Sequence, residues 1–323
     1  MHNWWRTMFL VRHIFLYIMK KIFTLLLLFV SMSLSAQIFI WKDGKIICQC
    51  DEFDSYDSIT VVSVELKGID TIIGRVNGAF SVAEEKRVYF SRGNLRYHVE
   101  ENRWQFADRQ YNMVGFANSK IGFEEVGWID LFGWGLSGYN GKNPNLTKLY
   151  PSDSADLMSG IAGTQYDCGV HNSIENGGNQ PGLWRLLTKD EWIYLINKRP
   201  NAQNLYSHAS VNGVPGIVLL PDNFVLPEGE EIYFTPNAGN YGINTYTISE
   251  WVKMQERGAV FLPASGYRIG TNISNMGSYG SYWSASVCNS GPYYFDFTPK
   301  DLYACYFINF SYAFSVRLVQ DVK

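Results

Sequence analysis

The amino-acid sequence predicts an α+β fold, in which many short antiparallel strands and two main helices are joined by long loops. From Ala79 onward, short apolar stretches alternate with segments rich in Gly, Asn, Ser and Tyr, which is typical of strands separated by turns. Helical periodicity with recognisable start and stop signals occurs at only two places. Two helices among many strands favour the α+β class, and loops of this length commonly carry function.

The first 36 residues have the pattern of a secretory signal peptide. Met19 is followed by two lysines, residues 22–34 form an apolar stretch, and Ala36 provides a small residue before the cleavage site. This apolar stretch is shorter than the ~20 residues that span a bilayer. We therefore expect translation to start at Met19, residues 1–36 to be removed, and no transmembrane span to be left after cleavage. An uncleaved anchor that includes apolar residues 4–18 is the alternative.

Removal of this segment leaves an acidic chain. The full sequence carries 27 Lys and Arg against 30 Asp and Glu, and residues 1–36 hold four of the basic residues and no acidic one. The mature chain therefore has 23 basic against 30 acidic residues, a net charge near −7. Because nucleic-acid binding depends on basic side chains that neutralise phosphates, this composition argues against a nucleic-acid partner.

Residues 37–64 predict a small β unit at the start of the mature chain. Apolar residues on both sides of an Asp-Gly turn at 43–44 are typical of a β-hairpin, and residues 57–62 form a third candidate strand. Three strands are near the lower limit of independent stability, so we expect this unit to pack against another part of the chain. Residues 65–78 are interpreted as a linker, and residues 79–323 as one large domain.

Capping residues mark the two predicted helices. Thr188 and Glu191 form a capping box, in which each side chain bonds to the backbone N–H of the other residue. Apolar positions within residues 192–196 then lie on one side of the helix, and Lys-Arg-Pro at 198–200 ends it. The second helix is expected from about Ser249 to Arg257. We interpret the apolar stripes of both helices as core contacts.

Further short strands are predicted on both sides of the helices. Each is a run of β-branched or aromatic residues next to turn residues. These runs cover residues 88–90, 94–98, 104–106, 259–263, 281–285, 293–297 and 314–319.

Cysteine and histidine spacing predicts no metal cofactor. An odd number of cysteines in an exported protein leaves at least one free or intermolecular thiol. Only one residue separates Cys48 from Cys50, which is too short a spacing for a zinc knuckle, so we interpret both as small strand residues. A structural calcium ion in the acidic loops at residues 124–125 and 153–156 is left open. The five cysteines are Cys48, Cys50, Cys168, Cys288 and Cys305.

Six motifs together carry a family resemblance. They are Val-Tyr-Phe-Ser-x-Gly-Asn-Leu-x-Tyr at 88–97, Gly-Trp-Ile-Asp-Leu-Phe-Gly-Trp-Gly at 127–135, Trp-Arg-Leu-Leu-Thr-Lys-Asp-Glu-Trp at 184–192, Gly-Ala-Val-Phe-Leu-Pro-Ala-x-Gly-Tyr-Arg at 258–268, Tyr-Trp-Ser-Ala-Ser at 282–286 and Ser-Val-Arg-Leu-Val at 315–319. The chain resembles the surface or secreted proteins of gut bacteria described as the Fibrobacter succinogenes major paralogous domain. This resemblance covers about residues 79–320 and implies a C-type lectin-like fold, similar to that of formylglycine-generating enzymes. Arg317, Trp283, Trp128 and Trp134 are then expected to be scaffold residues.

The same resemblance extends to the variable proteins of diversity-generating retroelements. In those proteins, mutation at template adenines diversifies a stretch between a Tyr-Trp-Ser and a Ser-Val-Arg motif, and Asn codons there do not become Lys, Glu, Gln, Met or Trp. Residues 286–314 contain Lys300 and none of the other four types, as expected for such a stretch or for any aromatic-rich β segment. The ligand-binding residues that this resemblance implies are Val287, Cys288, Asn289, Asp296, Tyr303, Cys305, Tyr306, Ile308, Asn309, Ser311, Tyr312 and Phe314.

Aromatic content supports a binding face in the same region. Residues 282–314 include twelve aromatic side chains, of which we expect half to be buried and half to be exposed. Aromatic and small polar side chains provide large contact areas at low entropic cost, as in antibody paratopes.

Catalysis and calcium-dependent sugar binding are the alternative hypotheses for the function of this region. Residues 184–192 also resemble formylglycine-generating enzymes, which hold copper with a closely spaced cysteine pair, whereas Cys288 and Cys305 are seventeen residues apart. Iron-using relatives need a histidine cluster, and the C-terminal half of the mature chain contains only His208. The Glu-Pro-Asn or Gln-Pro-Asp signature of calcium-dependent lectins is missing, because residues 180–182 read Gln-Pro-Gly. We therefore expect no enzymatic activity.

The sequence thus predicts an exported protein that binds a protein or glycan ligand on another cell or on a host surface through residues 286–314. A paralogous structural or adhesive surface protein is the first alternative, and a degenerate sulfatase-modifying-factor-like enzyme is the second. The expected location is the cell surface or the extracellular space, with the periplasm left open.

Overall fold

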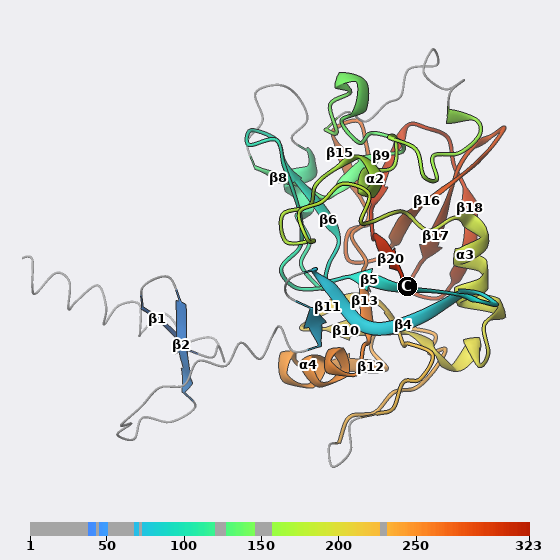
Figure 1. Ribbon diagram of the computed structural model, residues 1–323. Helices are drawn as coiled ribbons and strands as arrows, with labels where there is room; N and C mark the ends of the chain where they lie inside the picture. Colours follow the sequence, from blue (N-terminus) through green and yellow to red (C-terminus); the bar gives the residue numbers. More distant parts are fainter. Residues whose placement is uncertain are drawn as a thin grey trace, which may run out of the picture. The chain divides into compact units, whose positions relative to one another are not determined.

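The chain consists of two compact units, Met1–Val64 and Glu65–Lys323. The computed structural model describes most of the second unit (Figure 1). The predicted signal peptide, the candidate strand at 57–62 and the acidic loops at 124–125 and 153–156 lie outside the described residues. Within the described part of the chain, no helix is long and apolar enough to cross a membrane. The described residues are 38–42, 45–50, 68–70, 73–119, 127–145, 157–226 and 231–323.

The first unit contains the predicted hairpin. Strands β1 (Ile38–Lys42) and β2 (Lys45–Cys50) pair in antiparallel orientation on either side of the Asp-Gly turn position. The register shifts between Ile40 and Trp41, which marks a bulge in β1. Cys48 and Cys50 lie within β2, as predicted.

The second unit is α+β, as predicted, and consists mostly of strands in four sheets with a few short helices. Its largest sheet has seven strands, with the hydrogen-bonded order β15-β14-β19-β16-β17-β18 and β9 paired to β19. Strand β19 lies parallel to β16, whereas β16, β17 and β18 follow one another as antiparallel neighbours. The strand bounds are β9 Leu131–Gly133, β14 Tyr267–Ile269, β15 Asn272–Ser274, β16 Gly280–Cys288, β17 Gly291–Phe297, β18 Leu302–Phe307 and β19 Tyr312–Ser315.

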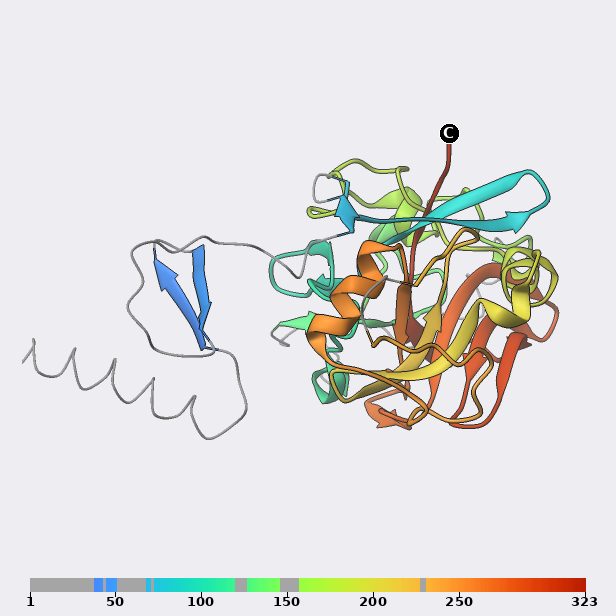
Figure 2. The same ribbon diagram turned by 90° about the horizontal axis from the view of Figure 1, so that it is seen from below.

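Three smaller sheets complete this unit. Their orders are β20-β5-β4-β3, β12-β10-β11-β13 and β7-β6-β8. Figure 2 shows the β4–β5 hairpin in cyan along one side of the unit and the red strands β16 to β18 on the other. The bounds are β3 Ile69–Asp70, β4 Arg75–Ala83, β5 Lys86–Ser91, β6 Leu95–His98, β7 Arg103–Phe106, β8 Trp128–Ile129, β10 Tyr206–Val211, β11 Val214–Leu219, β12 Asn244–Tyr246, β13 Val260–Pro263 and β20 Val319–Asp321.

Two strand predictions need correction. Strand β4 begins at Arg75, inside the segment interpreted as a linker, because alternating residues of this stretch are buried in the core. The stretch 314–319, predicted as one strand, is divided between β19 and β20. The residues between these two strands belong to neither of them. Their carbonyl groups accept from other segments: that of Val316 accepts from Leu95 N–H, and that of Leu318 accepts from Ser91 N–H.

Both predicted helices form, and both begin with a capping box. Helix α3 (Lys189–Ile193) starts at Thr188 and continues as the π-helical turn η6 (Tyr194–Lys198). Helix α4 (Ile248–Glu256) starts one residue before the predicted first residue, Ser249, because Thr247 and Glu250 form a second capping box there. The short remaining helices are α2 Cys168–His171, η2 Gly115–Ser119, η3 Tyr139–Gly141 and η7 Ala202–Asn204.

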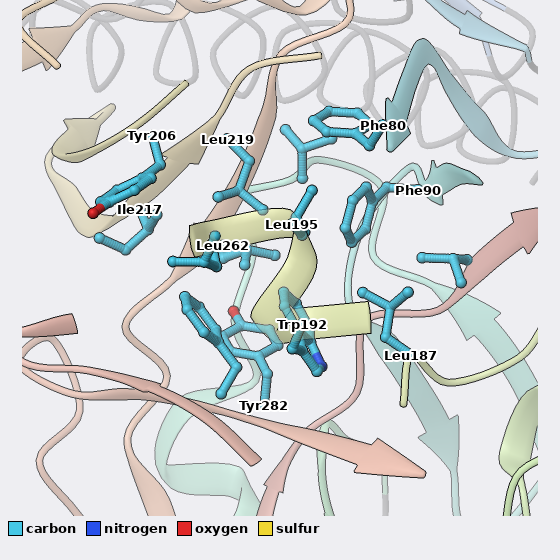
Figure 3. Close-up of a cluster of buried hydrophobic side chains, with 14 of the residues drawn as sticks. Phe80, Phe90, Leu187, Trp192, Leu195, Tyr206, Ile217, Leu219, Leu262 and Tyr282 are labelled. Atoms are coloured by element: carbon cyan, nitrogen blue, oxygen red, sulfur yellow. The ribbon is translucent and has the colours of Figure 1, made fainter. Parts of the chain in front are cut away.

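Helix α3 anchors one of the three apolar core clusters that the described residues form. The Trp192 ring stacks on Phe295 of β17, with ring centroids 4.7 Å apart and an interplanar angle of 8°. Figure 3 shows Trp192 among side chains from segments far apart in the sequence, including Phe90 of β5 and Tyr282 of β16. One face of the β16–β17–β18 segment is therefore covered by α3, which leaves the opposite face for other contacts.

Candidate functional site

Half of the twelve aromatic side chains in residues 282–314 are buried, as predicted. The others are exposed or half-buried, and the most exposed of them gather on β18. The buried ones are Tyr282, Trp283, Tyr294, Phe295, Phe297 and Phe314.

Strand alternation separates these aromatic side chains onto two faces of the sheet. Phe295 and Phe297 belong to the core cluster under α3. Because successive side chains point to opposite faces, Tyr294 and Asp296 point away from that helix. The register places Tyr306 of β18 opposite Tyr294 and Tyr303 opposite Asp296, with an irregularity between the two pairs. Cross-strand partners on one face are close neighbours.

A chain of ring contacts crosses this second face from its buried to its exposed end. We call it the aromatic row. Phe314 of β19 lies 4.6 Å from Tyr294, Tyr294 lies 6.1 Å from Tyr306, and Tyr306 lies 6.0 Å from Tyr303 between ring centroids. Exposure rises along the row, from 8% at Tyr294 to 54% at Tyr306 and 46% at Tyr303. The members of the row are Phe314, Trp283, Tyr294, Tyr306 and Tyr303.

Asp296 is the charged group beside the exposed end of the aromatic row. The Ser281 hydroxyl donates to its Oδ1 atom at 2.7 Å. Burial raises the pKa of the Asp296 carboxyl to about 6, although the hydrogen bond from Ser281 lowers it. Among the residues that the structure describes, Asp296 forms no ion pair. The carboxylate is thus partly desolvated without a cation to balance it.

Phe307 adds to the exposed surface, although the sequence did not single it out. It is 45% exposed and stacks beside Tyr306, with ring centroids 6.0 Å apart and an interplanar angle of 17°. On the α3 side it meets the Tyr293 ring at 6.2 Å, and the Lys189 ammonium lies 4.8 Å from the Tyr293 centroid. Its exposure results from its position at the end of the outer strand β18. That position depends on the order of strands in the sheet and not on residue type, so the sequence alone gives no signal for it.

The predicted ligand-binding residues divide into two groups. One group surrounds the exposed end of the aromatic row, and the other lies at the β16–β17 turn and the loop after β18. Exposed are Asn289, Tyr303, Tyr306 and Asn309; half-buried are Val287, Cys288, Asp296, Cys305, Ile308, Ser311 and Tyr312; buried is Phe314.

Phe314 corrects the prediction, because it is a core residue. It is 2% exposed and lies 4.3 Å from Trp283 between ring centroids. Strand β19 has neighbours on both edges, and its Phe314 side chain packs into a core cluster, separate from that of Trp192, that also contains Phe132. Phe314 therefore supports the aromatic row from inside and does not reach a ligand at the surface.

The cysteines are poorly suited to copper chemistry. Cys168 is buried, and Cys288 and Cys305 are half-buried free thiols on β16 and β18. Burial raises the pKa of Cys305 to about 11, with Lys189 acting in the opposite direction. Because the thiolate is the form that binds metals and attacks substrates, a thiol with a raised pKa is a weak ligand and nucleophile at neutral pH.

Among the described residues, histidine and acidic side chains offer no cluster for a metal ion either. His208 is buried, with Nδ1 at 2.7 Å from the Ala238 carbonyl oxygen and Nε2 at 2.8 Å from that of Thr298. Both ring nitrogens are therefore engaged by backbone. Across the described ranges, no group of three or more His, Cys, Asp or Glu side chains is placed to hold a metal.

Glu191, in the motif at residues 184–192, has a structural role. Its carboxylate accepts from the Thr188 N–H at 2.8 Å and from Arg185 Nη1 and Nη2 at 2.8 and 2.9 Å. Burial raises the pKa of Glu191, but the Arg185 guanidinium outweighs burial and holds that pKa below its usual value. A paired carboxylate of this kind is a poor general base.

The predicted scaffold residues hold the sheets together. The Trp283 indole donates to the Phe132 carbonyl at 2.6 Å, and the Trp134 indole donates to the Ser284 carbonyl at 2.7 Å. Arg317 is buried and donates to Gln110 Oε1 at 2.7 Å. Trp128 differs, since it is half-buried at the surface.

A surface cavity of about 310 Å³ lies elsewhere, beside Trp184, Arg185 and Asp321. Arg185 and Asp321 are 2.6 Å apart in an ion pair. The charges at this cavity therefore satisfy one another, which leaves little to attract a ligand.

The sequence matches no protein-family model, and comparisons with curated proteins and with solved structures found no match either. Function is therefore inferred from the sequence motifs and from the geometry of the described residues.

Proposed function

We propose that this protein is exported and binds a ligand through the exposed end of the aromatic row, on a C-type lectin-like fold and without catalysis. The observation that carries the proposal is the contiguous exposure of Tyr303, Tyr306 and Phe307 on β18, at 46, 54 and 45%. Soluble proteins seldom leave adjoining large apolar side chains in water unless they form an interaction site.

The support beneath this surface suits a binding face. The exposed rings lie on β18, which pairs with β17. Strand β17 is paired on its other edge with β16, and the Trp192 ring of α3 stacks on Phe295 on its buried face. The exposed rings therefore stand on a rigid sheet and lose little entropy when a ligand covers them. Tyrosine has only two rotatable side-chain bonds, which explains its value in antibody paratopes.

We further propose that residues 286–314 are diversified among related copies, with the ligand on another cell or a host surface. Eleven of the twelve implied positions are exposed or half-buried, and substitutions at such positions cost the fold little. Phe314 is the exception, and we expect it to be constant. A near-copy of the coding region for residues 282–317 that differs only at adenines, close to a reverse-transcriptase gene, would support diversification.

Binding is tested with the purified protein on glycan arrays and on panels of bacterial and host cells. The double variant Tyr303→Ala/Tyr306→Ala is expected to lose at least 10-fold in affinity for whatever surface the protein recognises. Tyr233→Ala is the matched control, since Tyr233 is 75% exposed in a different loop. Unchanged binding by the double variant, with the wild-type circular dichroism spectrum, would exclude this face as the binding site.

A further inference from the structure

A half-buried carboxylate among tyrosine rings narrows the chemistry of the ligand. Asp296 has Tyr303 opposite it on β18 and Tyr294 two residues before it on the same face. The Ser281 hydroxyl holds Oδ1, whereas no described residue donates to Oδ2. One carboxylate oxygen is thus fixed in orientation, and the other is free to accept from a ligand.

The electrostatic surroundings of Asp296 are uniformly suited to a cation. The Ser281 hydroxyl donates to it, Tyr303 lies opposite it, and it interacts with the phenols of Tyr294 and Tyr241, whose pKa values are both raised, chiefly by burial and next by the Asp296 charge. Aromatic faces attract cations through the negative face of the ring. The acidic mature chain adds a long-range attraction of the same sign.

Strand β18 also offers a backbone edge. It is the last strand in the order of the largest sheet, and no strand within the described ranges pairs with its outer side. An extended peptide can add to such an edge through main-chain hydrogen bonds. Its alternate side chains would then lie on the face that carries Tyr303 and Tyr306.

Distance favours a long basic side chain on that added strand. Strands in a sheet are ~4.8 Å apart, so a residue on the added strand lies ~10 Å from the backbone of β17. An extended arginine side chain on the added strand would pass over Tyr303 toward Asp296, because these two residues are opposite one another in the register of β17 and β18. Its planar guanidinium stacks on aromatic rings and forms paired hydrogen bonds with a carboxylate, which an ammonium group cannot do.

We propose that Asp296, Tyr303 and Tyr306 form a subsite for an arginine side chain of an extended polypeptide ligand that pairs with the outer edge of β18. This inference rests on the proposed function, and it narrows the ligand from any surface molecule to a polypeptide with an exposed basic segment.

The test uses N-acetylated, C-amidated peptides of sequence Thr-Thr-Arg-Thr-Thr, together with the same peptide in which citrulline replaces arginine. Citrulline keeps the shape and most hydrogen bonds of arginine but has no charge. Binding is followed by NMR in protein labelled at the tyrosine rings. We expect the arginine peptide to shift the Tyr303 and Tyr306 signals and to bind at least 10-fold more tightly than the citrulline peptide.

Variants of the full chain assign the effect to Asp296. Asp296→Asn keeps an oxygen for the Ser281 hydroxyl, and we expect it to weaken arginine-peptide binding at least 10-fold. Asp301→Asn is the matched control, because Asp301 is an exposed carboxylate on the same hairpin. Equal binding of the two peptides, equal binding by Asp296→Asn, or no tyrosine shift with the arginine peptide would each overturn the inference.

The same variants separate this inference from the proposed function. If Tyr303→Ala/Tyr306→Ala loses cell-surface binding while Asp296→Asn keeps it, the binding face stands and the arginine subsite is refuted. If neither variant changes cell-surface binding, both proposals fail.

Discussion

Replacement of Asp296 by Asn is expected to stabilise the protein at pH 8 and to leave its stability nearly unchanged at pH 4. Burial raises the pKa of the Asp296 carboxyl from 3.8 to about 6. The folded state therefore binds the proton more tightly than the unfolded state does. The stabilising contribution of this group is complete below pH 4 and is lost as the pH rises through 6. Asn carries no charge, so the variant does not lose this contribution.

The size of the effect follows from the same pKa. The difference between 3.8 and about 6 corresponds to about 3 kcal/mol of unfolding free energy at pH 8. Because Asp296 is half-buried, hydration of its carboxylate reduces the expected gain to about 1–2 kcal/mol. Such a gain would mean that the native carboxylate lowers the unfolding free energy at pH 8, as residues of binding sites often do.

Urea denaturation at pH 4, 6 and 8 measures this effect. The informative quantity is the difference in unfolding free energy between variant and wild type at each pH. Burial also raises the pKa of Asp167 to about 6, but Asp167 contributes equally to both proteins and cancels in the difference. The reasoning is refuted if Asp296→Asn is no more stable than wild type at pH 8, or if the exposed-site variant Asp301→Asn shows the same pH dependence.

Three further predictions concern the scaffold around the site. Trp192→Ala should lower the unfolding free energy by about 3–5 kcal/mol, measured in urea, because it removes a buried ring from the core; a loss below 1 kcal/mol would contradict the packing. Gly78→Ala should destabilise by more than 1 kcal/mol in the same assay, since a Cβ there would lie 2.6 Å from the Gly258 carbonyl oxygen; wild-type stability would show that the two segments separate easily. Cys305 should react with iodoacetamide at pH 7.5 at least 10-fold more slowly in native protein than in urea, because burial raises its pKa to about 11; equal rates would show that this thiol is not protected.

Local signals in the sequence predicted the helices well. Thr188 and Glu191 form both hydrogen bonds of the capping box, because the motif acts over four consecutive residues. The matching signal at Thr247 and Glu250 is equally local, and the prediction passed over it by starting the helix at Ser249. The overall α+β class followed from many short apolar runs, which do not depend on how the strands are paired.

The arrangement of the candidate site was less predictable, because it depends on long-range register. Asp296 was identified by residue type, but its position opposite Tyr303 follows from the irregular pairing of β17 with β18. Phe314 was predicted to bind ligand because it ends the stretch that we expected to be diversified, whereas its burial depends on β19 lying between β14 and β16. Exposure of Phe307 likewise depends on β18 being last in the sheet.

The path of residues 312–321 has a consequence for how the protein reaches its folded state. Strand β19 pairs with β9, β14 and β16, and β20 pairs with β5, so two sheets lack a strand until this segment is in place. Every partner strand is synthesised earlier, and contacts between distant parts of a chain form slowly. Completion of the fold must therefore wait until residues 312–321 have left the ribosome. For the exported protein that we propose, such a delay would be useful, since it favours an incompletely folded state during passage through the membrane.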